Sequence, residues 1–285
     1  MSDAACPLCD NNVFSKSWLS NIEFEGDVFN YLECSECHSL ICTPMPDERH
    51  LSIMYSETYS YPDEDTAAEK FTDVLDFLKN QEKGLFIDYG CGDGILLKAV
   101  SQLGWKTLGV EFNPDAAKEV VNHDGIKVVG HLTEIKEKAD VLHLGDVLEH
   151  LTSLNSQMPE ILNFLKDDGL LIAHGPLEAN PNLFTQTLKF FRQVRNPKRT
   201  KMAPYHVMLA TTKAQRQFFN RFSLTELVFK TKEVMFPAPE SISLNDVSDY
   251  RKVALFGVRK ISQMISSTNL EKFGNRYFYV GRKSR

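Results

Sequence analysis

Residues 87–94 read IDYGCGDG, and this glycine-rich stretch decides the fold. An apolar run, LFI, leads into it, and a second apolar run, ILLKAV, follows it. This order predicts a strand, a tight turn and a helix, because glycine adopts backbone angles that other residues avoid. The third glycine comes one residue earlier than a G-x-G-x-x-G dinucleotide fingerprint requires, so the match to that fingerprint is imperfect.

The residues on both sides of this turn alternate between strand-like and helix-like segments. A helix is expected over Asp65–Lys79, where apolar residues recur at i, i+3, i+4 and i+7 from Phe71. Strands are then predicted at 85–90, 106–112, 126–130, 139–146 and 170–176, with helices at 95–104, 113–123 and 157–169. Strands interleaved with helices of about ten residues indicate a doubly wound α/β sheet with mostly parallel strands.

The chain has 285 residues, which is long enough for one large domain or for a main domain with a small one. Hydrophobic residues make up 42% of it, which suffices for a packed core. The N-terminus lacks a basic start followed by an apolar run, and no stretch offers about eighteen uninterrupted apolar residues. We therefore expect a cytoplasmic protein without a transmembrane segment.

The net charge of −6 is unevenly distributed, because residues 1–188 are acidic and residues 189–285 are basic. A basic part of this size favours an anionic partner. The alternative is that the two parts pack together and neutralise most of their charge. Both interpretations stay open at this point.

Four cysteines occur near the N-terminus as two C-x-x-C pairs, Cys6 with Cys9 and Cys34 with Cys37. Four thiolates in this pattern favour a tetrahedral structural zinc site, which would supply much of the folding energy of so small a module. Disulfides are disfavoured in a cytoplasmic chain, and a redox dithiol is disfavoured because no βαβ pattern surrounds the pairs. We predict a zinc ribbon and a connection over residues 1–62.

Ligands of open α/β sheets bind beyond the carboxyl ends of the strands, near the switch in strand order. The residues expected at these ends are Asp88 to Gly94, Glu111, His131 to Thr133, Asp146 to His150, and Gly175 with Pro176. Glu111 ends the second strand, where a carboxylate can accept hydrogen bonds from both hydroxyls of a ribose. A ribose-bearing cofactor is therefore expected.

Several motifs together carry a resemblance to a known family. IDYGCGDG, GVEF at 109–112 and ADVLHLGDVLEHL at 139–151 resemble the successive motifs of class I S-adenosylmethionine-dependent methyltransferases, in particular ubiquinone-biosynthesis O-methyltransferases and sugar methyltransferases. Residues 204–231 resemble the late His-containing helix and strand of that group, and residues 276–283 resemble its last strand. The resemblance implies a seven-stranded Rossmann-like domain over residues 63–285, with a helical insertion near 177–205.

The resemblance also implies which residues hold S-adenosylmethionine. Gly90 and Gly92 would let the backbone approach the methionine end, and Asp88 would hold its ammonium group. Glu111 would take the ribose hydroxyls, and the adenine would lie near residues 131–132, where family members often carry an acidic or amide residue that is absent here. The full predicted set is Asp88, Gly90, Cys91, Gly92, Gly94, Glu111, Phe112, His131, Leu132 and Asp146.

Methyl transfer is an in-line displacement, so alignment of the nucleophile and exclusion of water supply much of the rate. A base is needed only where the acceptor hydroxyl is weakly acidic. The resemblance places His150 at the family's LEHL position and His206 in its substrate-side loop, so these two are the candidate catalytic bases. Either histidine could also be only structural.

The methyl acceptor is indicated by weaker patterns. Residues 181–199 form a basic amphipathic segment, which suits a lid over an anionic substrate, an interfacial helix, or a helix packed on the sheet. Chains that join a ribbon to this methyltransferase type resemble enzymes of glycan biosynthesis, which implies a sugar, a nucleotide sugar or a similar small metabolite as substrate. The alternatives are an rRNA base methyltransferase and a non-catalytic binding protein. The acidic ribbon region and a pI of about 5.8 disfavour nucleic acid as a partner.

Overall fold

The computed structural model describes residues 5–55, 71–113, 126–194, 200–234, 242, 249–266 and 273–284. The chain divides into two compact units. The first unit comprises residues 1–45, 175–221 and 229–277, and the second comprises residues 46–174, 222–228 and 278–285. The predicted boundary between residues 62 and 63 lies outside the described residues, so it stays a prediction.

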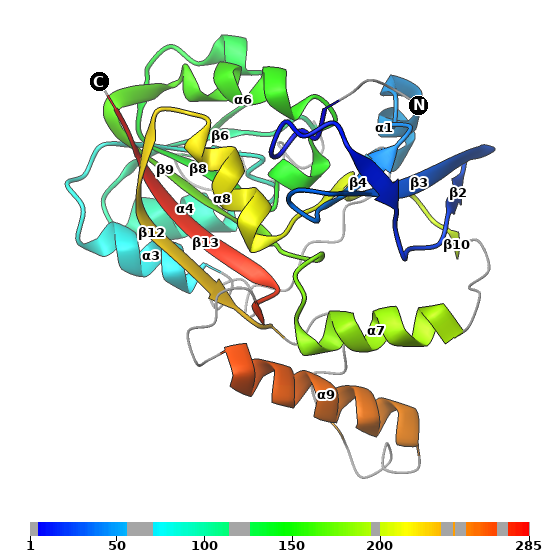
Figure 1. Ribbon diagram of the computed structural model, residues 1–285. Coiled ribbons are helices and arrows are strands. Elements are labelled where there is room, and N and C mark those ends of the chain that lie inside the picture. Colours follow the sequence, from blue (N-terminus) through cyan, green and yellow to red (C-terminus); the bar gives the residue numbers. More distant parts are fainter. Residues whose placement is uncertain are drawn as a thin grey trace. The chain divides into compact units, whose positions relative to one another are not determined.

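A seven-stranded sheet, most of which belongs to the second unit, has the order β12-β13-β9-β8-β5-β6-β7 (Figure 1). Its strands are β5 (Leu85–Tyr89), β6 (Lys106–Val110), β7 (Lys127–Val129), β8 (Ala139–Gly145), β9 (Leu165–Pro176), β12 (Leu224–Lys232) and β13 (Arg276–Lys283). The pairs β5–β6, β6–β7, β5–β8 and β8–β9 are parallel, which confirms the predicted doubly wound sheet. The chain builds outward from β5 to β7 on one side and then from β8 on the other, so the switch point lies between β5 and β8.

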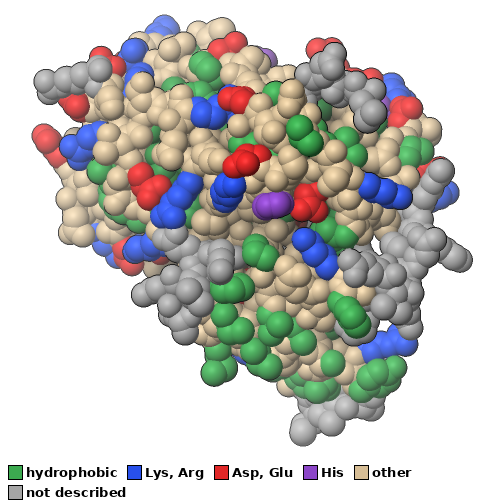
Figure 2. Space-filling model, viewed as in Figure 1, with side chains coloured by type: hydrophobic (Ala, Val, Ile, Leu, Met, Phe, Trp, Pro, Cys, Tyr) green, Lys and Arg blue, Asp and Glu red, His purple; other side chains and the backbone are tan. Residues whose placement is uncertain are grey.

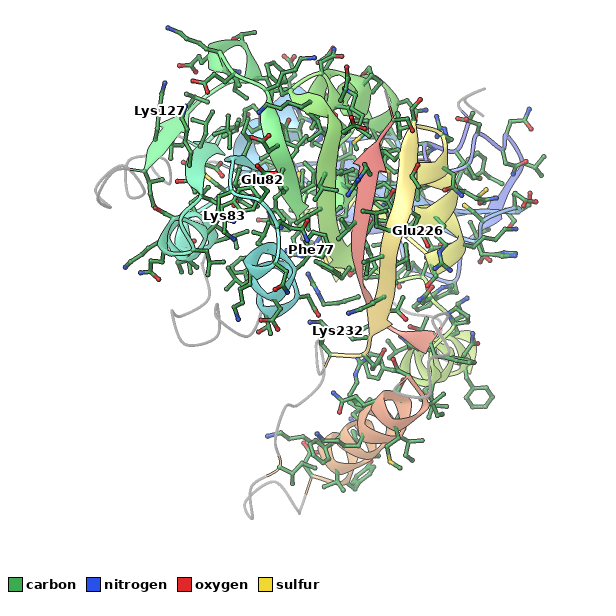
Figure 3. All side chains as sticks on the ribbon, turned by 90° about the vertical axis from the view of Figure 1, so that its left-hand side faces the viewer. Phe77, Glu82, Lys83, Lys127, Glu226 and Lys232 are labelled. Atoms are coloured by element: carbon green, nitrogen blue, oxygen red, sulfur yellow. The ribbon has the colours of Figure 1, made fainter. Side chains whose placement is uncertain are left out.

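Helices cover both faces of this sheet. The helices α3 (Thr72–Lys79) and α4 (Ile95–Gln102) lie on one face, and α6 (Leu154–Leu162) lies on the other (Figure 1). On the α3 face the buried cluster consists of Val74, Leu78, Phe86, Cys91, Leu96, Leu97, Val100, Trp105, Ile126, Val141, Leu170, Ile172, Phe278 and Val280. Phe77 packs against this cluster from α3 (Figure 3). The helix predicted over 65–79 is therefore present from Thr72 onward, and its earlier residues lie outside the described part.

The described part of the second unit also contains three shorter helical elements: α1 (Glu48–Met54), and the 3₁₀ turns η1 (Leu132–Glu134) and η2 (Leu148–His150). The helix predicted over 157–169 is wrong at both ends, because α6 spans 154–162 and residues 165–169 belong to β9. Leu165 pairs with Ala139 of β8, and Asp168 adopts a positive φ of 63°. The pairing of Leu165, followed by a register shift that brings Leu170 opposite Val141, therefore overrides a local sequence that resembles a helix end. The helix predicted at 113–123 lies outside the described residues except for Asn113.

The first unit contains a second sheet, with the order β10-β2-β3-β4-β11 and β1 paired to β3. Its strands are β1 (Phe14–Lys16), β2 (Ile22–Phe24), β3 (Asp27–Cys34), β4 (Leu40–Thr43), β10 (Thr200–Lys201) and β11 (Met208–Leu209). Its helices are α7 (Leu183–Val194), α8 (Thr212–Asn220) and α9 (Tyr250–Ser266). The N-terminal strands thus share one sheet with strands from residues 200–209.

Helix α9 exposes large apolar side chains, among them Tyr250 at 72% and Met264 at 71%. Figure 2 shows hydrophobic side chains gathered over this helix. All charged residues of α9 are Lys or Arg. Neither this helix nor any other in the described part of the chain is long and apolar enough to span a membrane.

Candidate functional site

The glycine turn after β5 takes a conformation that requires its glycines. Gly90, Gly92 and Gly94 have φ angles of 77°, 54° and 72°, a region that other residues rarely adopt. The backbone N–H groups of Gly90 and Cys91 donate to the carbonyl of Val110 at 2.8 and 3.1 Å. These bonds fix the turn against the end of β6, so its backbone is presented at the switch point of the sheet.

An alanine at position 90 tests how tightly the turn is packed. Its Cβ would lie 2.9 Å from Cγ2 of Val147, in addition to the strain of a positive φ. Gly90→Ala is expected to lower the free energy of unfolding by about 2–4 kcal/mol. Gly104→Ala is the matched control, because Gly104 also has a positive φ but no atom within 4 Å of its added Cβ. Urea unfolding should show the smaller loss for the control, and equal losses would contradict the close approach to Val147.

The Glu111 carboxylate lies beside the glycine turn. Its Oε2 accepts a hydrogen bond from the N–H of Gly92 at 2.9 Å, and its Oε1 accepts one from the N–H of Asn113 at 2.8 Å. Each carboxylate oxygen can accept a further hydrogen bond. Glu111 therefore fixes the turn and retains acceptor capacity for ribose hydroxyls.

Aromatic rings gather next to Glu111. The Phe112 ring is 50% exposed, with its centroid 5.4 Å from that of Tyr89 and 5.8 Å from that of His131. Leu132 follows in η1, where Oε1 of Glu134 accepts hydrogen bonds from the backbone of Gly130 and His131. An exposed ring with apolar neighbours suits stacking against adenine. Tyr89, which was not in the predicted set, is buried at the end of β5 and contacts the Phe112 ring edge-on.

Two other predicted cofactor residues are Cys91, whose side chain is buried, and Asp146, whose backbone has a positive φ. The Cys91 side chain belongs to the buried core cluster, so only its backbone can face a ligand at the turn. Burial raises the pKa of this thiol. Asp146 follows β8 with a positive φ of 52°, and its N–H donates to the carbonyl of His174 at 2.9 Å. Asp146 therefore carries local backbone strain at the end of β8.

Asp88 is the penultimate residue of β5 and is almost completely buried, with 4% of its surface exposed. Its Oδ1 lies 2.6 Å from Nδ1 of His143, a residue that sequence analysis did not assign to the site. The two residues face each other in the register of β5 and β8. A buried carboxylate beneath the turn is thus held by a histidine of the neighbouring strand.

The two candidate bases belong to different units, and each has its own partners. In the second unit, Nδ1 of His150 lies 3.1 Å from the hydroxyl of Tyr55. In the first unit, Nδ1 of His206 lies 2.7 Å from Oε2 of Glu178. The backbone carbonyl of His206 accepts a hydrogen bond from the hydroxyl of Tyr31 at 2.5 Å. A carboxylate that holds one ring nitrogen orients the imidazole and favours proton acceptance at the other.

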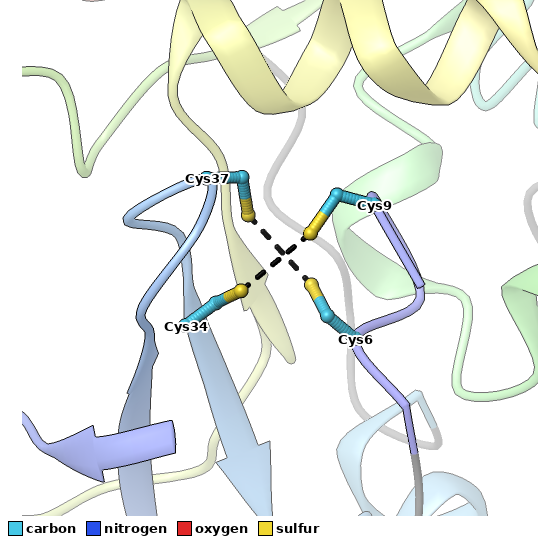
Figure 4. A group of neighbouring side chains, drawn as sticks. All are labelled: Cys6, Cys9, Cys34 and Cys37. Atoms are coloured by element: carbon cyan, nitrogen blue, oxygen red, sulfur yellow. Dashed lines mark hydrogen bonds between the residues drawn. The ribbon is translucent and has the colours of Figure 1, made fainter. Parts of the chain in front are cut away.

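The four cysteines of the N-terminal pairs converge on one point in the first unit (Figure 4). All four sulfurs lie within 4.8 Å of one another, with 3.7 Å between Cys6 and Cys37 and 3.5 Å between Cys9 and Cys34. A disulfide would need about 2.05 Å, whereas sulfurs bound to one tetrahedral zinc lie about 3.8 Å apart. The arrangement fits a closed Cys₄ zinc site and does not fit disulfides.

The protein surroundings of the four thiols also suit a metal. Contact with the Cys6 thiol lowers the pKa of Cys37 to about 5, while the same contact and burial raise the pKa of Cys6. The side-chain amide of Asn11 donates to Sγ of Cys34 at 3.4 Å, a bond that would stabilise a thiolate ligand. Each C-x-x-C pair is followed by a residue with positive φ, Asp10 at 63° and His38 at 60°.

Comparison with known proteins gives a family match over more than half of the chain. A model of the methyltransferase domain matches residues 63–231. The ubiquinone biosynthesis O-methyltransferase of Glaesserella parasuis is 29% identical over 117 residues, which is 34% of this chain and 49% of the relative. The ribosomal protein L11 methyltransferase of Thermoanaerobacter pseudethanolicus is 28% identical over 131 residues, which is 42% of each chain. The chain spans about half the length of the curated relatives it matches or less.

A solved structure agrees with the observed architecture. The complex that contains the Haloferax volcanii Trm112 methyltransferase activator matches 83% of this chain and 97% of its own matched chain, with a TM-score of 0.51. The identity is 11%, so this likeness concerns the fold alone.

Proposed function

Because the chain belongs to the methyltransferase domain family, as its motifs predicted, we propose that it transfers a methyl group from S-adenosylmethionine to a small anionic metabolite, such as a sugar or nucleotide sugar. The cofactor assignment rests on the glycine turn, which is hydrogen-bonded to the Glu111 carboxylate at the switch point of the sheet. A dinucleotide is less well suited, because the glycine spacing departs from its fingerprint.

Each residue of the turn region has a defined part in this proposal. Glu111 binds the ribose hydroxyls through its remaining acceptor capacity, and Phe112 stacks against the adenine. Asp88 holds the ammonium group, and the backbone at Gly90 and Gly92 lies against the methionine end. The bound cofactor supplies an electrophilic methyl group on a sulfonium. The protein contributes alignment and exclusion of water.

A base is required if the acceptor is a sugar hydroxyl, because such a group is weakly acidic. His206 with Glu178 is the better suited candidate, since the carboxylate fixes the Nδ1 proton and directs proton uptake to Nε2. His150 with Tyr55 is the other candidate. In both cases the second residue orients the imidazole.

The class of acceptor rests on three supports. The curated relatives include ubiquinone biosynthesis O-methyltransferases, whose names refer to a small-molecule pathway. The positive charge of residues 189–285 favours an anionic acceptor. The sulfurs of the N-terminal ribbon are suited to a structural zinc ion, and ribbon-bearing chains of this type resemble enzymes of glycan biosynthesis.

The test has two stages. Isothermal titration of the purified protein with S-adenosylhomocysteine should give saturable binding at one site per chain. Incubation of the protein with a lysate and labelled S-adenosylmethionine should then place the label in the sugar and nucleotide fraction, rather than in RNA, protein or lipid. Absence of binding would contradict the cofactor, whereas label confined to RNA or protein would contradict the acceptor class alone.

A further inference from the structure

The pair formed by Asp88 and His143 is buried inside the second unit. The side chains are 5% and 2% exposed, and Oδ1 of Asp88 lies 2.6 Å from Nδ1 of His143. The His143 ring stacks on Phe86, with 5.8 Å between centroids and 25° between planes. A carboxylate excluded from water needs such a partner, because burial of an uncompensated charge is unfavourable.

The surroundings of His143 decide which atom carries the proton. Its Nε2 is buried and has no hydrogen-bond partner within the described structure. A protonated imidazole would leave a charged N–H donor at that position without an acceptor. We therefore assign a neutral imidazole whose Nδ1–H donates to Oδ1 of Asp88. The aspartate then keeps its negative charge.

The backbone is built around the two histidine rings of this region. A Cβ at Gly145 would lie 2.6 Å from Cε1 of His143 and 2.7 Å from Nε2 of His174. Glycine at this position therefore leaves room for the His143 ring in the orientation that reaches Asp88. In the residues that the structure describes, no hydrogen bond is made to Oδ2 of Asp88. Oδ2 is available for an ionic ligand.

We propose that His143 is a positioning residue for cofactor binding: its bond to Oδ1 holds the Asp88 carboxylate so that Oδ2 binds the ammonium group of the cofactor's methionine end. This inference rests on the proposed function and deepens it. It predicts that His143 acts on one part of the cofactor only. The adenosine part, which Glu111 and Phe112 bind, should be indifferent to His143.

Two ligands separate these parts. S-adenosylhomocysteine carries the ammonium group, whereas 5′-methylthioadenosine has the same adenosine and a thioether but no amino acid. His143→Leu removes the donor and should weaken S-adenosylhomocysteine by about tenfold or more, as expected for a charge-assisted hydrogen bond. The same variant should bind 5′-methylthioadenosine within about twofold of the unchanged protein. His143→Asn, whose amide can donate to Oδ1, should restore most of the lost affinity.

Asp88→Asn supplies an independent variant that retains the size of the side chain. It should show the same ligand-selective loss, and His143→Leu added to it should have little further effect, because both changes remove one interaction. Equal weakening of both ligands in folded His143→Leu would overturn the proposal, as would unchanged affinity for S-adenosylhomocysteine. If His143→Leu does not fold, the proposal is overturned when Asp88→Asn fails to weaken S-adenosylhomocysteine selectively, or when His143→Asn loses as much affinity for this ligand as Asp88→Asn does. Absence of binding by the unchanged protein would instead contradict the proposed function.

Discussion

Cys34→Ser is expected to release the zinc ion and to unfold the ribbon of the first unit. Structural zinc sites bind with about 10–16 kcal/mol, and this energy is available for folding only when all four ligands are present. The net stability of a whole domain is about 5–15 kcal/mol, so loss of the metal is not offset elsewhere.

The loss should extend beyond the N-terminal residues, because helix α8 is hydrogen-bonded to the turns that carry the cysteine pairs. Oγ1 of Thr211 donates to the carbonyl of Cys37 at 2.7 Å, and it also caps α8 by accepting from the N–H of Ala214. Lys213 pairs with Glu36 at 2.6 Å. At the other end of α8, the guanidinium of Arg221 donates to the carbonyl of Pro7 at 2.8 Å. Disorder in the turns therefore removes the bond that holds the capping residue Thr211 and two ion-assisted contacts of α8.

Metal content and thermal unfolding together check this prediction. Unchanged protein purified without chelator should contain about one zinc per chain. Cys34→Ser should contain far less zinc, and the thermal unfolding transition of its first unit should be lost. Cys42→Ser is the matched control, since Cys42 is also buried in the first unit but lies outside the four-sulfur cluster. A full complement of zinc in Cys34→Ser, or the same loss in the control, would contradict the Cys₄ assignment.

The parts of the site that could be predicted from the sequence are those set by local backbone geometry. The glycines of 90–94 predict a turn because glycine adopts their positive φ angles far more readily than other residues do, and Glu111 follows at the end of the next apolar run. The cysteine pairs could also be predicted from local sequence, since the spacing within each C-x-x-C is itself typical of metal ligands. Such features do not depend on which strand becomes the neighbour of which.

The parts that could not be predicted depend on pairing between distant segments. His143 sits in an apolar strand and reads as an ordinary core residue until β8 is placed next to β5, opposite Asp88. The strands β10 and β11 have two residues each, too few to show any periodicity, yet they join the N-terminal sheet. The helix predicted over residues 165–169 is wrong for the same reason, because Leu165 pairs with β8 ahead of a register shift that brings Leu170 opposite Val141.

Glu111→Ala is expected to weaken S-adenosylhomocysteine by about a hundredfold or more. Each hydrogen bond from a ribose hydroxyl to a charged carboxylate contributes about 1.5–3 kcal/mol, and two such bonds correspond to at least two decades of affinity. The substitution also leaves the N–H groups of Gly92 and Asn113 without their acceptors, which loosens the turn. Glu111→Gln should be nearly as damaging, because its amide NH₂ would face one of these donors.

The control for this change is Glu137→Gln, which removes the same charge from the same unit. Glu137 is exposed, pairs with Lys106 at 2.8 Å and lies outside the predicted site, so its variant should bind both ligands normally. Titration calorimetry of Glu111→Ala should show a loss for 5′-methylthioadenosine as well as for S-adenosylhomocysteine, since both carry the ribose. This pattern differs from that of His143→Leu, which spares 5′-methylthioadenosine. Unchanged affinity for either ligand in Glu111→Ala would contradict the assignment of Glu111 to the cofactor site. If Glu111→Ala weakens both ligands and His143→Leu weakens only S-adenosylhomocysteine, the ribose contact is distinguished from the ammonium contact.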